Sequence, residues 1–187
     1  MCTPIGHSMF GFITYYFWEK VNIKNIDPKK LFIFVILANL PDVDFIPGLI
    51  LGDPNRFHHV ISHSVIFLVV VAFLLGKFDF VCEKKGYFKK VSILSFLLLG
   101  HMLIDFFTVD TREPLGIDLF WPYPRYFISP FPVFPSFNRR FSHLVSVDNL
   151  QTLFIELLVF LSLFGFLFFV RYFFDKVSTQ YSKKQVK

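Results

Sequence analysis

Three long apolar segments dominate the pattern of hydrophobic and polar positions along the chain. They cover residues 60–76, 91–108 and 150–174. The last one contains a single charged residue, Glu156, ahead of Arg171. A helix that crosses a bilayer needs about 17–25 predominantly apolar residues, and each segment meets or nearly meets that length. The pattern therefore predicts three membrane helices.

Two shorter apolar stretches precede them, at residues 3–18 and 27–40. Each begins with a capping side chain followed by proline, Thr-Pro in the first and Asp-Pro in the second, which is typical of a helix start. The second helix, of about 13 residues, would be roughly 20 Å long and too short to cross a bilayer alone. We expect it to pack against the longer helices or to enter the membrane only partway.

The composition agrees with a membrane protein. The 187 residues are 54% hydrophobic, include 29 Phe and have a mean hydropathy of +0.55. A soluble domain of this size could not bury so much apolar surface. We predict an all-α fold, a multi-pass transmembrane bundle of about five helices that forms a single domain over residues 1–187.

Residues 109–149 have a different composition, rich in proline and aromatic residues. Proline at this density is incompatible with a regular helix. We expect an outer loop that holds Trp and Tyr at the level of the lipid headgroups. The alternative is a lid or a wall of a substrate pocket.

Lysine and arginine occupy different connections between the helices. All 13 Lys lie in segments 20–30, 77–90 and 176–187, whereas five of the six Arg lie in the other connections between helices. The positive-inside rule places the Lys-rich loop and the C-terminus in the cytoplasm, with the N-terminus outside. The positions of the charges therefore matter more than the formal net charge of +5, and no nucleic-acid partner is expected.

On that topology, every predicted helix carries an imidazole or a carboxylate near its outer end. Each group alone has an ordinary structural explanation, although a carboxylate inside an apolar helix is costly without a partner. Their coincidence at one level predicts a shared metal site near the non-cytoplasmic face of the membrane. The candidate ligands are His7, Asp42, Asp44, His58, His59, His63, His101, Asp105 and Glu156.

The spacing of these residues also fits metal binding. His101 and Asp105 have i, i+4 spacing, as do His59 and His63, which places both members of a pair on one face of a helix. Such a pair suits two ligands of one ion, or one ligand of each of two neighbouring ions.

Asp42 and Asp44 are two residues apart, so an extended backbone would place both on one side. Imidazole with carboxylate favours Zn²⁺, with Mn²⁺ or Fe²⁺ as alternatives, and the distant Cys2 and Cys82 do not recommend a thiolate site. The candidates exceed the needs of one tetrahedral ion. We therefore expect two or three divalent ions, an arrangement typical of phosphoester hydrolysis.

Five short motifs follow one another in a recognisable order. They are Gly6-His7, Leu40-Pro-Asp-Val-Asp44, His58-His-Val-Ile-Ser-His-Ser64, His101-x3-Asp105 and Phe120-Trp-Pro122. Together they resemble the LexA-binding, inner-membrane-associated family of predicted metal-dependent hydrolases. The resemblance covers most of the chain, from His7 to at least Trp121, and its specificity lies in the combination.

One motif departs from that family. Arginine usually follows the first His of its His-Arg-x-x-Thr-His-Ser motif, and here His59 takes that place. The resemblance selects His58 and His63, whereas helical spacing selects His59 and His63. Both pairs therefore stay open, with His63 common to the two.

More distantly, the order of these residues is similar to that of the zinc-dependent phospholipase C and P1 nuclease superfamily, helical enzymes that bind three zinc ions and cleave phosphodiesters. That superfamily usually carries a His four residues before its last Glu, where this chain has Thr152. By this similarity the ligands would be His7, Asp44, His63, His101, Asp105 and Glu156.

We predict a membrane-bound hydrolase that cleaves a phosphoester of a lipid or lipid-linked substrate with metal-activated water. Asp42 or Asp44, whichever is not committed to metal, is the candidate general base. The apolar loop at 119–137 could receive acyl chains. Contacts with the substrate are expected from Arg56, Arg112, Arg139, Arg140 and Trp121.

The alternative is a non-catalytic membrane protein in which metal only ties the helices together. Its role would be binding or regulation, and its Lys segments would dock anionic lipid or a protein partner that the sequence does not identify. Coordination separates the two hypotheses, because a structural metal site is closed whereas a catalytic one keeps a position for water.

Overall fold

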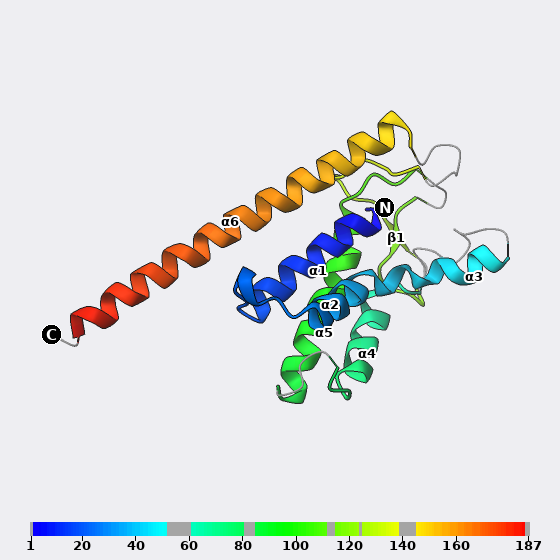
Figure 1. The fold of residues 1–187 in the computed structure, drawn as a ribbon. Coiled ribbons are helices and arrows are strands. Elements are labelled where there is room, and N and C mark those ends of the chain that lie inside the picture. The colour runs from blue at the N-terminus through cyan, green and yellow to red at the C-terminus, as the bar shows by residue number, and fades with distance from the viewer. Residues whose placement is uncertain are drawn as a thin grey trace.

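The computed structural model describes residues 2–51, 61–80, 85–111, 115–123, 125–138 and 145–185. The protein is an all-α membrane bundle, as the sequence predicts, with one two-stranded sheet in the described residues (Figure 1). The helices are α1 (Pro4–Trp18), α2 (Pro28–Asn39), α3 (Phe45–Ile50), α4 (Val65–Leu75), α5 (Tyr87–Phe106) and α6 (Val147–Gln185), with 3-10 turns η1 (Ile23–Asn25) and η2 (Leu40–Asp44).

The first two helices begin where the capping pairs predict. The Thr3 hydroxyl accepts a hydrogen bond from the Gly6 amide at 3.3 Å. The Asp27 carboxylate accepts from the amides of Lys29 and Lys30 at 3.0 and 3.3 Å. These side chains satisfy amides that have no partner within the helix, and the proline that follows each cap loses no hydrogen bond there.

The main hydrophobic core lies between α1, α2, α4 and α5. Tyr15 of α1 meets Phe34 of α2 edge to face, with ring centroids 5.5 Å apart, while Leu68 of α4 and Leu98 of α5 are buried beside them. The backbones of α1 and α2 approach closely at Gly11, where a Cβ would lie 2.9 Å from the Phe34 carbonyl oxygen. A larger residue at this position would push the two helices apart.

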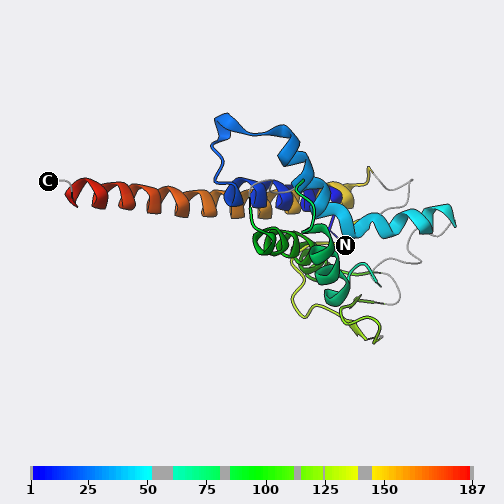
Figure 2. The same cartoon turned by 90° about the horizontal axis from the view of Figure 1, so that it is seen from below.

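Helix α6 packs along α1 and then extends beyond the other helices in both views (Figures 1 and 2). Its 39 residues correspond to a length of about 58 Å. Phe160 stacks on Phe134 of the loop with ring centroids 5.6 Å apart, and Phe164 contacts Phe12 and Tyr16 of α1. These aromatic contacts attach the first part of α6 to the bundle.

Three helical segments are long and apolar enough to cross a membrane: Pro28–Gly48, Tyr87–Phe106 and Val147–Val177. The first corrects the prediction that the helix starting at residue 27 is too short to span. Helix α2 does end at Asn39, but η2 and α3 continue the helical path. Pro41 does not stop it, because proline suits the first turn of a new helical segment.

The membrane helix predicted at 60–76 is shorter than expected. Helix α4 has 11 residues, too few to cross a bilayer, and residues 61–64 form a turn before it. The Ser64 hydroxyl donates to the Trp121 carbonyl oxygen at 3.3 Å, which ties this turn to the loop and leaves His63 outside the helix. Apolar composition alone could not reveal such a contact between distant segments.

In the described part of the Pro- and aromatic-rich region, no helix forms before α6 begins at Val147. Two short strands, β1 (Ile117–Asp118) and β2 (Tyr126–Phe127), pair in antiparallel fashion. The Val109 amide donates to the Phe134 carbonyl oxygen at 2.8 Å, so the loop folds back over the C-terminal end of α5.

Successive helices alternate in direction along the bundle, with α2, η2 and α3 forming one continuous path (Figure 1). The last turns of α5 carry His101 and Asp105, and α1, α4 and α6 begin at that same end of the bundle. Lys20 follows α1, Lys30 lies in the first turn of α2, and Lys77 follows α4. Candidate ligands and lysines therefore lie at opposite ends of these helices.

Candidate metal centre

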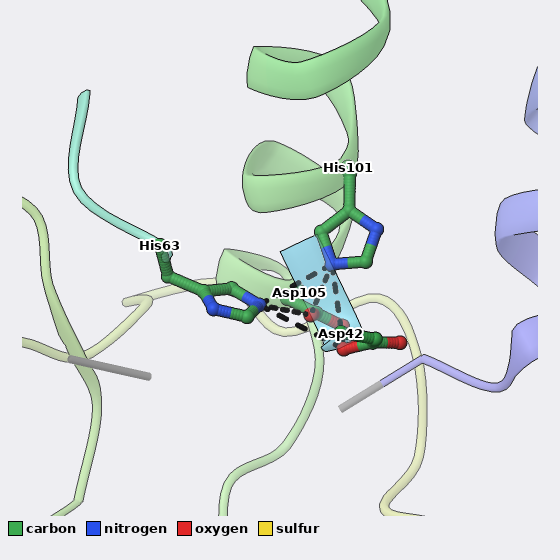
Figure 3. Close-up of side chains that lie close together, drawn as sticks. All are labelled: Asp42, His63, His101 and Asp105. Atoms are coloured by element: carbon green, nitrogen blue, oxygen red, sulfur yellow. Dashed lines mark hydrogen bonds and ion pairs between the residues drawn. The ribbon is translucent and has the colours of Figure 1, made fainter. Parts of the chain in front are cut away.

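Four of the predicted ligands meet at one end of the bundle, and we call them the His–Asp cluster (Figure 3). They are Asp42 of η2, His63 of the turn before α4, and His101 and Asp105 of α5. One ligand atom from each residue lies within 4.8 Å of all the others. The Asp42 side chain is 13% exposed and the other three are fully buried. Three segments thus deliver two imidazoles and two carboxylates to one buried point.

His101 and Asp105 point the same way from adjacent turns, as their spacing predicts, with Nε2 3.3 Å from Oδ2. The other ring nitrogen of His101, Nδ1, lies 2.7 Å from the Ala38 carbonyl oxygen. A carbonyl oxygen only accepts, so Nδ1 carries the proton and Nε2 presents its lone pair to the cluster when the ring is neutral. No sequence pattern pointed to Ala38, because only its backbone takes part.

His63 is held in the same manner. Its Nε2 lies 3.2 Å from Oδ2 of Asp105, and its Nδ1 lies 3.0 Å from the Ser62 hydroxyl and 3.5 Å from Asp44. Burial alone would lower the pKa of His63, but its hydrogen bonds to Asp105 and Asp44 outweigh burial and raise that pKa. The imidazole is therefore more basic than a free one, and its Nε2 faces the centre of the cluster.

Asp42 and Asp44 do not share one side of an extended strand, which corrects the prediction from their spacing. They lie in the 3-10 turn η2 and approach different parts of His63. Oδ1 of Asp42 is 3.9 Å from His63 Nε2 and 3.5 Å from His101 Nε2, whereas Asp44 accepts a short hydrogen bond from Ser62 on the Nδ1 side. Asp42 thus faces the cluster, and Asp44 orients His63.

Asp105 connects the cluster to the start of α1. Its Oδ1 accepts a hydrogen bond from the Cys2 amide at 2.8 Å and lies 3.3 Å from Nε2 of His7. The fully buried His7 ring stacks on His101 with centroids 3.8 Å apart. Neither ring nitrogen of His7 has a hydrogen-bond partner among the described residues. His7 therefore borders the cluster and can supply a further nitrogen to it.

Glu156 is fully buried but does not belong to the cluster. Its two carboxylate oxygens accept hydrogen bonds from the amide and the hydroxyl of Thr3, the capping residue of α1. Gly6 leaves room for this contact, since a Cβ there would lie 2.9 Å from Glu156 Oε2 and 2.3 Å from Cys2 Sγ. Glu156 thus joins α6 to the first turn of α1.

The remaining predicted site residues are placed less centrally. Trp121 is 37% exposed, and it meets the site region through its carbonyl oxygen, which accepts from Ser64. Six others lie outside the described residues: Arg56, His58, His59, Arg112, Arg139 and Arg140. The choice between His58 and His59 as the partner of His63 is therefore still open.

The donor set fits a divalent cation. Nε2 of His63 and Nε2 of His101 lie 3.2 Å apart, and Oδ1 of Asp42 is buried without a hydrogen-bond partner among the described residues. Unpaired buried polar atoms are rare in native proteins and call for an explanation. Two imidazole nitrogens and two carboxylates match the ligand preferences of Zn²⁺, and also of Mn²⁺ or Fe²⁺.

The sequence model of the YdjM inner membrane protein family matches residues 1–176. The chain belongs to the YdjM family. It is also similar to the inner membrane protein YbcI of Escherichia coli (strain K12), with 30% identity over 144 residues that cover 68% of this chain and 78% of YbcI. No solved structure matches the chain.

Membership of the YdjM family confirms the inner-membrane part of the resemblance found in the sequence. The names of the family and of YbcI refer only to the inner membrane. LexA binding, metal-dependent hydrolysis and kinship with the phospholipase C superfamily stay predictions.

Proposed function

We propose that this YdjM-family protein is a membrane-embedded, metal-dependent hydrolase that cleaves a phosphoester. The observation that carries the proposal is the convergence of Asp42, His63, His101 and Asp105 within 4.8 Å. Each imidazole of the cluster has its Nδ1 engaged away from it, which leaves the two Nε2 atoms directed inward. A site built only to stabilise the core would not need two buried nitrogens facing each other.

The four residues of the His–Asp cluster would hold the ion. A bound Zn²⁺ or similar ion lowers the pKa of a coordinated water to about 7 and polarises a phosphoryl oxygen. The chain's own contribution is to fix the ligands: Ala38 sets the tautomer of His101, while Ser62 and Asp44 orient His63.

Asp44 is the better candidate for general base. Asp42 faces both imidazoles and is committed to the cluster, whereas Asp44 lies behind His63 and has a side chain that is 9% exposed. A carboxylate that is not committed to the ion can take a proton from a water molecule within its hydrogen-bond reach. It is at the same time within hydrogen-bond reach of Ser62.

A second ion, expected from the number of candidate ligands, would be held by Asp105 and His7. Oδ1 of Asp105 lies 3.3 Å from Nε2 of His7, and neither ring nitrogen of His7 has a hydrogen-bond partner among the described residues. With two ions, the site would stabilise both the attacking and the leaving oxygen of the phosphoester. Cys2 borders the same region through its amide.

The site is proposed to lie near the non-cytoplasmic face. The lysines of the helix connections lie at the opposite end of the bundle from the cluster, and lysine is enriched in cytoplasmic loops. Lipid of the surrounding bilayer is then the most accessible source of phosphoester.

One observation favours a different function, a structural metal site in a binding or regulatory protein. Four donors from one cluster can complete a tetrahedral shell, and three of the four side chains are fully buried. A closed shell leaves no position for water. The 13% exposure of Asp42 provides the opening that the hydrolase needs.

The test is metal analysis together with turnover of bis-p-nitrophenyl phosphate by detergent-purified protein. Asp105→Asn removes one ligand with little change in shape, and Asp79→Asn is the matched control, because Asp79 is 71% exposed and pairs with Lys90. Wild type and the control should contain metal and turn over the probe, and Asp105→Asn should do neither. Metal without turnover would favour the structural site, and wild type without metal would refute both.

A further inference from the structure

An apolar pocket of about 710 Å³ lies between η2, α3 and α4 and reaches α5. Among the described residues that line it, two have polar side chains, Asp44 and Ser62. Leu68 and Leu98 are almost completely buried at its floor, whereas Phe67 is 37% exposed at its rim. The volume lies within the range of about 300–1,000 Å³ that is typical of small-molecule sites. Such walls suit a hydrocarbon rather than a sugar or a nucleotide, which would leave polar groups unpaired.

The polar end of the pocket adjoins the His–Asp cluster. The Ser62 hydroxyl donates to Asp44, and that carboxylate lies 3.5 Å from Nδ1 of His63. A molecule whose apolar part fills the pocket therefore has its other end next to His63. The pocket and the proposed catalytic centre share one boundary.

The rim of the pocket carries apolar side chains that are open to the surroundings. Val43 is 49% exposed and Ile61 is 42% exposed. Val43 lies within the candidate membrane span Pro28–Gly48. In a bilayer these side chains would contact lipid chains, so a chain can enter the pocket without passing through water.

From these contacts we infer that the pocket binds one acyl chain of a bilayer phospholipid whose phosphoester lies at the His–Asp cluster. The inference rests on the proposed hydrolase function and names its substrate class. The volume fits a single acyl chain and is small for a polyprenyl chain. None of the described residues of the loop at 119–137, which the sequence offered as the acyl site, lines this pocket.

The test uses phosphatidylglycerol with a diazirine at the end of one acyl chain, incorporated into vesicles with the full-length protein. Val71→Trp fills the pocket, and Val70→Trp is the matched control, because Val70 is 50% exposed and does not line it. Photolabelling of segment 61–71 should fall about tenfold in Val71→Trp, since the tryptophan displaces about two methylene groups. Phenylalanine fills less of the pocket than tryptophan, so Val71→Phe should give an intermediate loss of photolabelling. The control, Val70→Trp, should be labelled like wild type.

Chain binding does not require the metal, so labelling should persist after chelation, whereas turnover should stop. In mixed micelles, Val71→Trp should raise the KM for phosphatidylglycerol about tenfold, whereas Val70→Trp should turn over phosphatidylglycerol and bis-p-nitrophenyl phosphate like wild type. Labelling without turnover of either substrate would refute the proposed hydrolase function and the role of the lipid as its substrate. The acyl-chain site itself would still stand.

Two results would overturn the chain site itself. Equal labelling of segment 61–71 in Val70→Trp and Val71→Trp would mean that the label reports only lipid surrounding the protein. Stronger competition by polyprenyl phosphate than by unlabelled phosphatidylglycerol would assign the pocket to an isoprenoid chain instead.

Discussion

Nε2 of His63 and Nε2 of His101 face each other at 3.2 Å in the buried part of the bundle. Each ring is held from behind, His101 by the Ala38 carbonyl oxygen and His63 by the Ser62 hydroxyl. Two lone pairs at this distance repel each other unless a proton or a cation lies between them. With two carboxylates beside them, the two rings form a site that selects positive charge.

Asp42→Asn and Asp44→Asn separate a ligand from a positioning residue. Asp42 faces both imidazoles, so its loss should abolish metal retention through dialysis, whereas loss of Asp44 should weaken affinity by about 10–100-fold. Competition with a chelator of known affinity measures both effects. Similar losses in the two variants would contradict these separate roles.

At saturating zinc, Asp44→Asn should retain its metal and still lose activity. Removal of a general base lowers kcat by about 10²–10⁴-fold, and the loss should be largest at low pH, where hydroxide is scarce. The pH profile of kcat measures this difference. A metal-loaded Asp44→Asn protein with wild-type kcat would exclude Asp44 as the base.

Zinc should stabilise the protein more strongly at about pH 8 than at about pH 6. The pKa of His63 is raised in the metal-free folded protein. The stability that its proton contributes is therefore present below the pKa of His63 in the unfolded state and is lost as the pH rises through its pKa in the folded state. Zinc must displace the proton of His63 in order to bind, and a smaller fraction of the protein carries that proton at high pH. Thermal unfolding with and without zinc measures the difference, and a larger zinc effect at the lower pH would contradict it.

Glu156→Gln should destabilise the fold and leave the metal content unchanged. The substitution replaces one of the two oxygens that accept hydrogen bonds from Thr3, which should cost about 1–3 kcal/mol of unfolding free energy. Thermal unfolding in detergent, with metal analysis of the same sample, provides the measurement. Loss of metal at unchanged stability would instead make Glu156 a ligand, as the distant resemblance implies.

The proposed orientation can be tested with single cysteines in a background that lacks Cys2 and Cys82. Tyr123 is 75% exposed in the loop near the cluster end, and Lys24 is exposed in η1 at the lysine end. In intact cells from which the outer membrane has been removed, an impermeant maleimide should label Tyr123→Cys and not Lys24→Cys. The reverse pattern would place the cluster on the cytoplasmic side.

Much of this arrangement could be predicted because helix direction and residue spacing follow from local rules. Caps and prolines fixed the starts of α1 and α2, and i, i+4 spacing placed His101 and Asp105 on one face. Alternating helices then had to bring their outer ends to one level. The gathering of ligands therefore needed no knowledge of tertiary contacts.

The parts that could not be predicted depend on contacts between distant segments. Asp42 and Asp44 lie in a 3-10 turn, which the sequence Pro-Asp-Val-Asp does not distinguish from extended backbone. His63 leaves the helix because Ser64 bonds to the loop carbonyl of Trp121. Glu156, which carries the chemistry of a ligand, is engaged by Thr3 instead.

Zinc K-edge X-ray absorption of the purified, zinc-loaded protein tests the central claim most directly. The account predicts a shell of nitrogen and oxygen at about 2.0–2.1 Å with the outer-shell scattering of two imidazoles, and its loss in the variant that carries both His63→Gln and His101→Gln. A sulfur shell at about 2.3 Å, or a zinc spectrum that this variant leaves unchanged, would contradict it.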